Sequence, residues 1–175
     1  MKTKPTLKPK LLPLDFCQPS GAIFSEDRLH RYALWRSFAT LLSTAPRYAM
    51  FIGLNPSTAD ETNDDPTIRR CIDYTKRWGF DAYVMTNLFA YRATDPEVMK
   101  KAEDPVGPQN DQYLIELAKS AGIVIACWGN HGAFKDRAAH IKPLIPNLQC
   151  LVLTKTGEPG HPLYLGKNLM PFSFE

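Results

Sequence analysis

The stretch "FIGLNPSTADETNDDPTIRR", residues 51–70, decides the fold, because an apolar run passes directly into a polar, acidic segment. Residues 48–54 form a short continuous apolar run, which is typical of a strand covered on both faces in a parallel sheet. Asp65 and Pro66 then form a cap followed by a first-turn proline, and apolar residues recur at helical spacing up to Gly79. The stretch therefore predicts a buried strand, a polar loop and a helix.

The same alternation continues along the chain. Further strands are expected over residues 82–88, 123–128 and 150–154, and further helices over residues 108–121 and 133–145. An additional helix is expected to begin at Ser25 and to stop before Pro46, with one apolar face formed by Leu34, Phe38, Leu41 and Leu42. Strands that alternate with helices indicate crossover units. The pattern predicts a three-layer α/β/α fold with a short parallel four-stranded sheet.

The length and composition favour one folded domain. The chain has 175 residues, of which 44% are hydrophobic, so it can bury one sizeable core. Residues 1–20 are rich in proline and lysine and are expected to form a loosely ordered arm. Residues 21–175 are expected to form a single α/β domain.

The charge is not that of a polycation. Four of the 21 Lys and Arg residues lie in the first ten positions, which leaves 17 against 18 Asp and Glu. The folded part therefore does not bind nucleic acid through bulk phosphate neutralisation alone, although a local basic patch remains open.

No metal or cofactor is expected. The four cysteines (Cys17, Cys71, Cys127 and Cys150) are scattered without a C-x-x-C pair, which gives no support for a zinc site or an iron–sulfur cluster. They fit idle thiols in a reducing cytosol. The sequence has no apolar run of about 18 residues and no secretory signal. We therefore expect a cytoplasmic protein without a membrane partner, whose oligomeric state stays open.

Polar side chains follow each of the four expected parallel strands. In open parallel sheets, ligands bind beyond the carboxyl ends of the strands, where these loops gather. Amides occur in three of the four loops, which suits the recognition of a small, flat, polar group such as a nucleobase edge. The candidates for substrate contacts are Ser57, Asn87, Arg92, Trp128, Asn130 and Tyr164.

Several segments carry a family resemblance. The stretches "RYALWR", "GLNPSTADETNDDPTIRR", "NLFAYRATDP", "WGNHG" and "HPLYL" resemble the signatures of a bacterial and phage family, domain of unknown function 1643. They extend over roughly residues 31–165. This resemblance implies no activity.

The order of "GLNP", "TNLF", "ACWGNHG" and "HPL" is also distantly similar to the motif order of the uracil-DNA glycosylase superfamily. This resemblance implies a uracil-DNA glycosylase-like fold. It also implies that Asn55 holds the attacking water, Asn87 reads a base, Trp128 and Gly129 form a turn, and His161 faces the departing base.

This reaction also needs a general base, which takes a proton from the attacking water. An asparagine amide orients water but cannot take its proton. The candidate general base is therefore Asp64, or else Asp60 or Asp65. Arg69 and Arg70 lie in the first turns of a helix and are candidate phosphate contacts. Each residue also has a structural interpretation: Asn55 as a turn residue, Asp65 as a helix cap, Trp128 as core.

Three functions remain open. The first is an enzyme that recognises a nucleobase or nucleotide and hydrolyses an N-glycosidic bond in an unusual substrate. The second is a non-catalytic module on the same fold, which binds a nucleobase-containing small molecule or nucleic acid. The third is a magnesium-dependent hydrolase or phosphoryl-transfer enzyme that uses Asp60, Glu61, Asp64 and Asp65.

Overall fold

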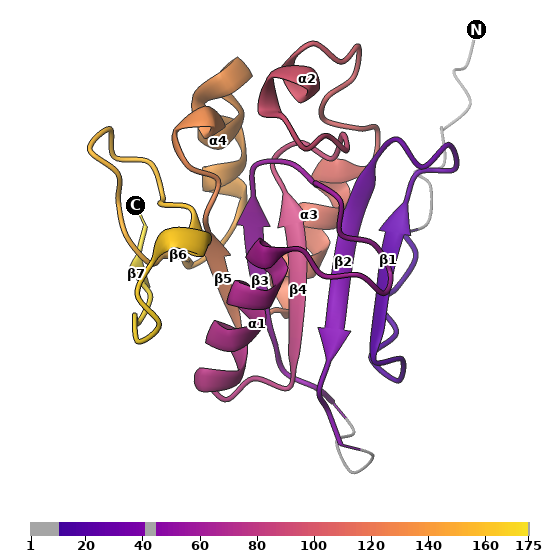
Figure 1. The fold of residues 1–175 in the computed structure, drawn as a ribbon, viewed down its shortest axis with the longest axis vertical. Coiled ribbons are helices and arrows are strands. Elements are labelled where there is room, and N and C mark those ends of the chain that lie inside the picture. Colours follow the sequence, from indigo (N-terminus) through magenta and orange to yellow (C-terminus); the bar gives the residue numbers. More distant parts are fainter. Residues whose placement is uncertain (1–10, 41–44, 175) are drawn as a thin grey trace, which may run out of the picture.

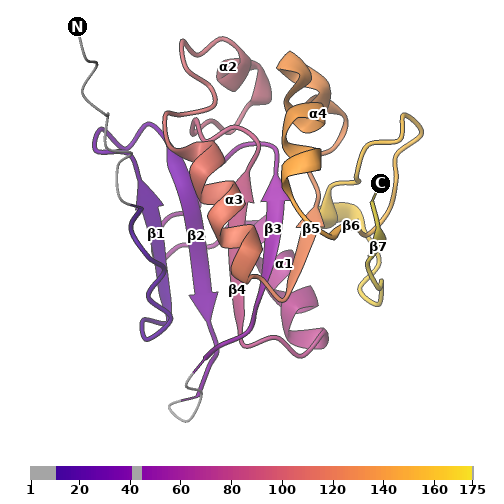
Figure 2. The same cartoon turned by 180° about the vertical axis from the view of Figure 1, so that it is seen from behind.

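The computed structural model of the protein describes residues 11–40 and 45–174, which form a mixed α/β fold (Figures 1 and 2). One sheet of seven strands runs through it in the order β1-β2-β4-β3-β5-β6-β7. The strands are β1 (Ser20–Phe24), β2 (Arg31–Ser37), β3 (Tyr48–Gly53), β4 (Ala82–Asn87), β5 (Ile123–Ala126), β6 (Leu148–Cys150) and β7 (Phe172–Ser173).

Three of the predicted strands form as β3, β4 and β5, whereas the strand expected over residues 150–154 forms earlier, as β6 over Leu148–Cys150. These four strands lie side by side and are parallel, in the order β4-β3-β5-β6. Every residue of β3 and β4 is buried, as expected for strands covered on both faces. The carboxyl ends of β3, β4 and β5 therefore meet at one edge, the upper edge in Figure 1. The prediction of a four-stranded sheet was nevertheless wrong, because three antiparallel strands extend it to seven.

One of these additional strands, β2, lies where a helix was expected from Ser25. Strands β1 and β2 form an antiparallel hairpin, and β2 pairs with β4. Residues 31–36 are all buried because β2 lies inside the sheet, so its apolar residues served both faces of a strand rather than one face of a helix. Leu41 and Leu42 lie outside the described residues.

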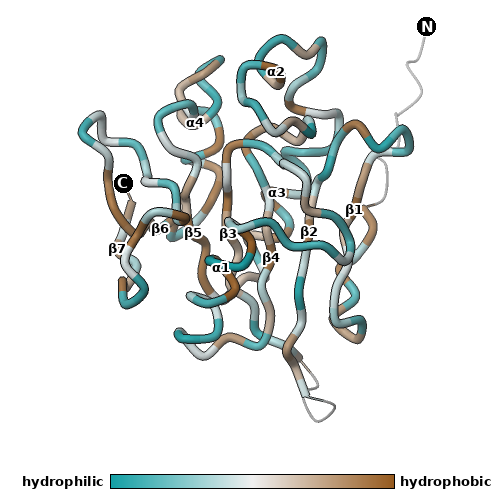
Figure 3. Tube along the Cα trace, in the orientation of Figure 1, coloured by the Kyte–Doolittle hydropathy of each residue, from teal (hydrophilic) through white to brown (hydrophobic). Residues whose placement is uncertain are grey.

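Helices cover both faces of the sheet. Helix α1 (Pro66–Arg77) packs on one face through Ile68, Cys71 and Tyr74. Helices α3 (Asn110–Ser120) and α4 (Arg137–Ile141) contribute to the core on the other face. Figure 3 shows apolar residues concentrated in the central strands and a hydrophilic loop before α1.

Helix α1 begins at the predicted Asp65 cap and Pro66 first turn. The Asp65 carboxylate accepts a hydrogen bond from the Ile68 amide at 2.8 Å, and Pro66 opens the first turn. Gly79, with φ of +76°, follows the helix. Helix α3 also confirms the predicted helix over residues 108–121.

The predicted helix over residues 133–145 is broken into short pieces. A 3₁₀ segment (Asn130–Asp136), α4 and a second 3₁₀ turn (Lys142–Leu144) follow one another. Phe134 and Lys135 have non-helical backbone angles, which prevents one continuous helix. A short helix α2 (Pro96–Lys100) and a 3₁₀ turn (Pro162–Tyr164) were not predicted.

The segment before β1 contacts the domain from residue 11 onward. Leu11, Leu14 and Phe16 pack against the core, and the Trp35 indole N–H donates to the Asp15 carbonyl at 3.1 Å. Residues 1–10, the rest of the expected arm, lie outside the described residues. Among the described residues, no helix is long and apolar enough to cross a membrane.

Candidate functional site

A cavity of about 580 Å³ lies where the parallel strands end. Its walls come from the loops after β3, β4 and β5, the first turn of α1, the start of β2 and the loop around His161. It includes five of the predicted site residues, which are Asn55, Ser57, Asn87, Trp128 and His161. These residues are distant in sequence, and the carboxyl edge of the sheet brings them together.

Asn55 follows β3 and is held in one orientation. Its Nδ2 donates to the Ala93 carbonyl at 2.7 Å and to the Pro56 carbonyl at 3.1 Å. Both amide hydrogens are therefore used, and Oδ1 has no hydrogen bond from the described residues. Asn55 offers the cavity an acceptor, which can orient a water or a ligand donor.

Asn87 ends β4 and is 3% exposed. Its buried Nδ2 has no hydrogen-bond partner among the described residues. Its backbone is fixed, because Asn110 Nδ2 on α3 donates to the carbonyls of Asn87 and Leu88 at 3.0 and 2.9 Å. Leaving a buried amide donor unpaired is costly. A buried side chain with an unpaired donor, on a backbone held in place at a cavity wall, is the arrangement expected of a ligand contact.

Arg31 was not predicted as a site residue, yet it lines the cavity and is 2% exposed. Its Nη1 donates to the Ala59 carbonyl at 2.6 Å, while its Nε has no partner among the described residues. Burial lowers the pKa of Arg31 to about 10, and the Asp65 charge acts in the opposite direction. The guanidinium therefore remains charged at neutral pH.

His161 lies exposed at the cavity, just before Pro162. Its Nδ1 accepts from the Leu163 amide at 3.4 Å, which leaves the proton of the neutral ring on Nε2. Desolvation by surrounding atoms lowers the pKa of His161 from 6.5, and the Asp65 charge opposes this shift. His161 is therefore a neutral hydrogen-bond donor at pH 7.

The loop after β5 contributes Cys127, Trp128 and His131. Trp128 is 2% exposed, and its Nε1 donates to Glu158 at 2.7 Å, so it is a core residue with one edge at the cavity. Burial raises the pKa of the Cys127 thiol to about 12, which keeps it protonated and poorly nucleophilic. Lys100 Nζ lies 3.2 Å from Nδ1 of His131.

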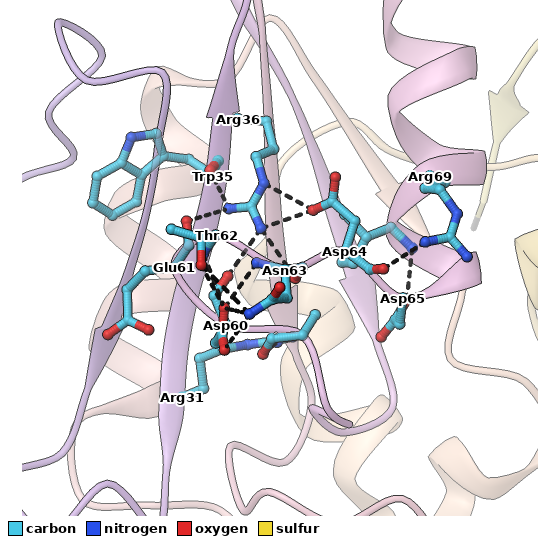
Figure 4. A network of polar contacts seen from close by, with 12 residues as sticks. Arg31, Trp35, Arg36, Asp60, Glu61, Thr62, Asn63, Asp64, Asp65 and Arg69 are labelled. Atoms are coloured by element: carbon cyan, nitrogen blue, oxygen red, sulfur yellow. Dashed lines mark hydrogen bonds and ion pairs between the residues drawn. The ribbon is translucent and has the colours of Figure 1, made fainter.

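Asp64 does not line the cavity. It lies 2.7 Å from Nη2 and 2.8 Å from Nε of Arg36, a β2 residue at 6% exposure (Figure 4). Arg36 also donates to the carbonyls of Trp35, Asp60, Glu61 and Asn63, and so holds the acidic loop against the sheet. Asp65 is the carboxylate that this loop contributes to the cavity wall.

Five other predicted contacts also lie outside the cavity wall. Tyr164 is 85% exposed, and Asn130 accepts from Thr154 and Thr156 in a neighbouring loop. Arg69 donates to the Asp64 carbonyl and Arg70 to the Leu165 carbonyl. Arg92 donates to the Arg28 carbonyl and lies over the Phe24 ring.

The acidic residues of the loop have separate partners. Asp60 accepts from the side-chain amide of Asn63 and from the backbone amides of Thr62 and Asn63, which lowers its pKa. Glu61 pairs with Arg28 at 2.8 Å. The described residues contain no group of three or more His, Cys, Asp or Glu side chains placed to hold a metal ion. The carboxylates predicted as magnesium ligands are therefore not gathered into one site.

Several wall residues were not among the predicted site residues: Arg31, Thr58, Thr67, Thr94, Cys127, His131 and Leu163. Thr94 and His131 lie in loops that follow predicted strands, and this position is the sequence signal that could have identified them. Arg31 had none, because it was assigned to a helix that does not form.

The fold and the cavity define an α/β protein with a mostly apolar cavity, lined by a few polar side chains, at the carboxyl edge of its parallel strands. A family comparison adds that residues 31–163 match the family described as "Protein of unknown function (DUF1643)". The chain belongs to this family, and every residue of the cavity wall falls within the matched range. No curated protein and no solved structure matches the chain.

Proposed function

We propose that this protein recognises a nucleobase or nucleotide in the cavity at the carboxyl edge of its sheet. The unpaired, buried Nδ2 of Asn87 carries the proposal. An asparagine side chain presents a donor beside an acceptor, which is complementary to the donor and acceptor edge of a base. A carbonyl oxygen of the base would accept from Nδ2 and satisfy it.

The size and the lining of the cavity support a ligand of this class. A volume of about 580 Å³ falls within the range of small-molecule sites. Asn55 adds an acceptor, while Ser57, Thr58 and Thr94 add hydroxyls. Fixed polar groups in a partly apolar cavity provide orientation and specificity.

Hydrolysis of an N-glycosidic bond is the second candidate function, and the geometry of His161 favours it. Negative charge develops on the leaving base during this reaction, and a neutral imidazole with its proton on Nε2 can stabilise that charge. Asn55 Oδ1 can orient a water. Asp65 replaces Asp64 as the candidate base because it lines the cavity, although its carboxylate also caps α1.

The test of recognition uses Asn87→Leu, which removes the unpaired amide while it retains a similar volume. Isothermal titration with a panel of nucleosides and nucleoside 5′-monophosphates should give binding to the wild type. For Asn87→Leu we expect at least a tenfold loss, since a hydrogen bond to a buried group is removed. The melting temperature should stay equal or rise, because an unsatisfied donor is removed.

Asn130→Leu is the matched control, since this asparagine lies outside the cavity wall. Its ligand affinity should equal that of the wild type. Equal binding by the wild type and Asn87→Leu would refute the role of Asn87. Mass spectrometry for free base in the same samples tests hydrolysis, which His161→Ala should abolish.

A further inference from the structure

Two buried arginines of β2 differ sharply in their partners. Arg36, at 6% exposure, has an ion pair with Asp64 and donates to four backbone carbonyls. Arg31, at 2% exposure, has no ion pair with a carboxylate of the described residues, and its guanidinium donates only to the Ala59 carbonyl. A buried charge is normally paired, because desolvation strongly disfavours an isolated one.

The position of Arg31 indicates which group accepts hydrogen bonds from its unpaired guanidinium donors. Its side chain lines the cavity, whereas Arg36 does not. Neither Nε nor Nη2 of Arg31 has a hydrogen-bond acceptor among the described residues. A guanidinium presents its donors as a planar fork that matches the oxygens of a phosphate or carboxylate.

Other donors of the wall point to the same ligand chemistry. The first turn of α1, a helix of twelve residues, lines the cavity. Pro66 has no amide hydrogen and the Ile68 amide is used by Asp65, but the Thr67 amide has no acceptor among the described residues. The Nδ2 of Asn87 adds another unpaired donor. Helix N-termini with free amides attract anions.

Asp65 is the negatively charged residue of this cavity wall, but it does not serve as the ion-pair partner of Arg31. Its carboxylate caps α1 and lies near enough to Arg31 to act on its pKa, yet the two form no ion pair. Arg31 and the first turn of α1 line the same cavity, and each has a donor without a partner among the described residues.

We propose that the cavity takes a nucleoside phosphate, whose phosphate oxygens accept hydrogen bonds from Arg31 and from the first turn of α1. This inference rests on the proposed function and narrows it from nucleobases in general to anionic nucleotides. It moves the phosphate contact from Arg69, Arg70 and Arg92, which lie outside the cavity wall, to Arg31.

The experiment is isothermal titration of matched pairs, each nucleoside against its 5′-monophosphate, with inorganic phosphate as a third probe. The wild type should bind one monophosphate about 10- to 100-fold more tightly than its nucleoside, the range for hydrogen bonds to a charged group. Arg31→Met should lose this preference. Arg31→Lys, which keeps the charge without the fork, should retain part of it and covers the case in which Arg31→Met does not fold.

A thermal melt without ligand separates a binding role of Arg31 from a structural role. Arg31→Met should melt no lower than the wild type, because a buried charge without a counterion is removed. Arg36→Met, the control from the same strand, should melt much lower. If Arg31→Met and Arg31→Lys both melted as low as Arg36→Met, Arg31 would be a structural residue and the proposal would be overturned.

The remaining outcomes distinguish this proposal from the one on which it rests. Equal binding of a nucleoside and its monophosphate by the wild type would overturn the phosphate contact and leave base recognition intact. Binding of inorganic phosphate that depends on Arg31, without binding of any nucleoside or nucleotide, would support an anion site and overturn base recognition. If the wild type bound none of the three probes, both base recognition and the phosphate contact would be overturned.

Discussion

Gly53 and Asn87 face each other at the last residue pair of the parallel β3–β4 ladder, and the glycine leaves room for the asparagine side chain. A Cβ at Gly53 would lie 2.9 Å from Asn87 Oδ1 and 3.6 Å from Met85 Sδ. The first contact is too short for carbon and oxygen. The absence of a side chain at Gly53 therefore allows the Asn87 amide to occupy its observed position.

Gly53→Ala should destabilise the protein by about 1–3 kcal/mol and weaken ligand binding, because the new methyl group displaces a packed side chain. Urea unfolding and titration with the best ligand of the panel measure the two effects. The matched control is Gly166→Ala, where an added Cβ meets nothing within 4 Å. If both variants were neutral, the space beside Asn87 would not be limiting.

Arg36→Met should destabilise the protein by about 3–5 kcal/mol, because it leaves Asp64 and several carbonyls of the acidic loop without their donor. Urea unfolding provides the measurement. Glu61→Gln serves as the control, since its pair with Arg28 is exposed and should contribute little. Equal losses in the two variants would contradict a specific role of Arg36 in holding the loop.

The lowered pKa of His161 makes its contribution to stability dependent on pH. The folded state binds this proton less readily than the unfolded state, so the contribution is full above pH 6.5 and is lost as pH falls through the folded pKa. The stability advantage of the wild type over His161→Gln should therefore shrink between pH 7.5 and pH 5. Urea unfolding at several pH values gives this difference, and an advantage that grew on acidification would show that the pKa is raised.

Asp65→Asn provides a second check on the same histidine. The Asp65 charge raises the pKa of His161, so its removal should lower that pKa further. An NMR titration of the ring in the wild type and the variant would show the direction of the change. The cap is retained in part, since asparagine is also a good N-cap residue.

Alkylation of the native protein should distinguish the cysteines. Cys17 is exposed, whereas Cys127 is buried and, with its pKa raised to about 12, is thiolate at only about one part in ten thousand at pH 8. Peptide mapping after iodoacetamide treatment should find Cys17 modified and Cys127 intact, and urea should expose both. Rapid native modification of Cys127 would instead mark it as a reactive group of the cavity.

The central strands and α1 were predictable because their causes are local. A strand that is covered on both faces reads as a continuous apolar run, and the Asp65 and Pro66 pair starts a helix through its own backbone geometry. The cavity position followed from the rule that ligands bind at the carboxyl edge of parallel strands. That rule gave Ser57, Asn87 and Trp128 as candidates, and the family resemblance added Asn55 and His161.

The hairpin of β1 and β2 was not predictable in this way. Leu34 and Phe38 have helical spacing, but the segment from Arg31 becomes a strand because it pairs with β1 and β4, which come from other parts of the chain. Tertiary pairing overrides a local periodicity. The same pairing brings Arg31 to the cavity wall.

The sequence by itself determined the parallel core, the capped helix α1 and the edge at which polar loops gather, since these depend on neighbouring residues and on chain direction. Only the tertiary structure decided the partners of the charged side chains. Asp64 lies against Arg36 rather than in the cavity, and Arg31 remains without a carboxylate partner among the described residues. The reason is physical, because the environment of a buried charge depends on segments that are brought beside it by folding.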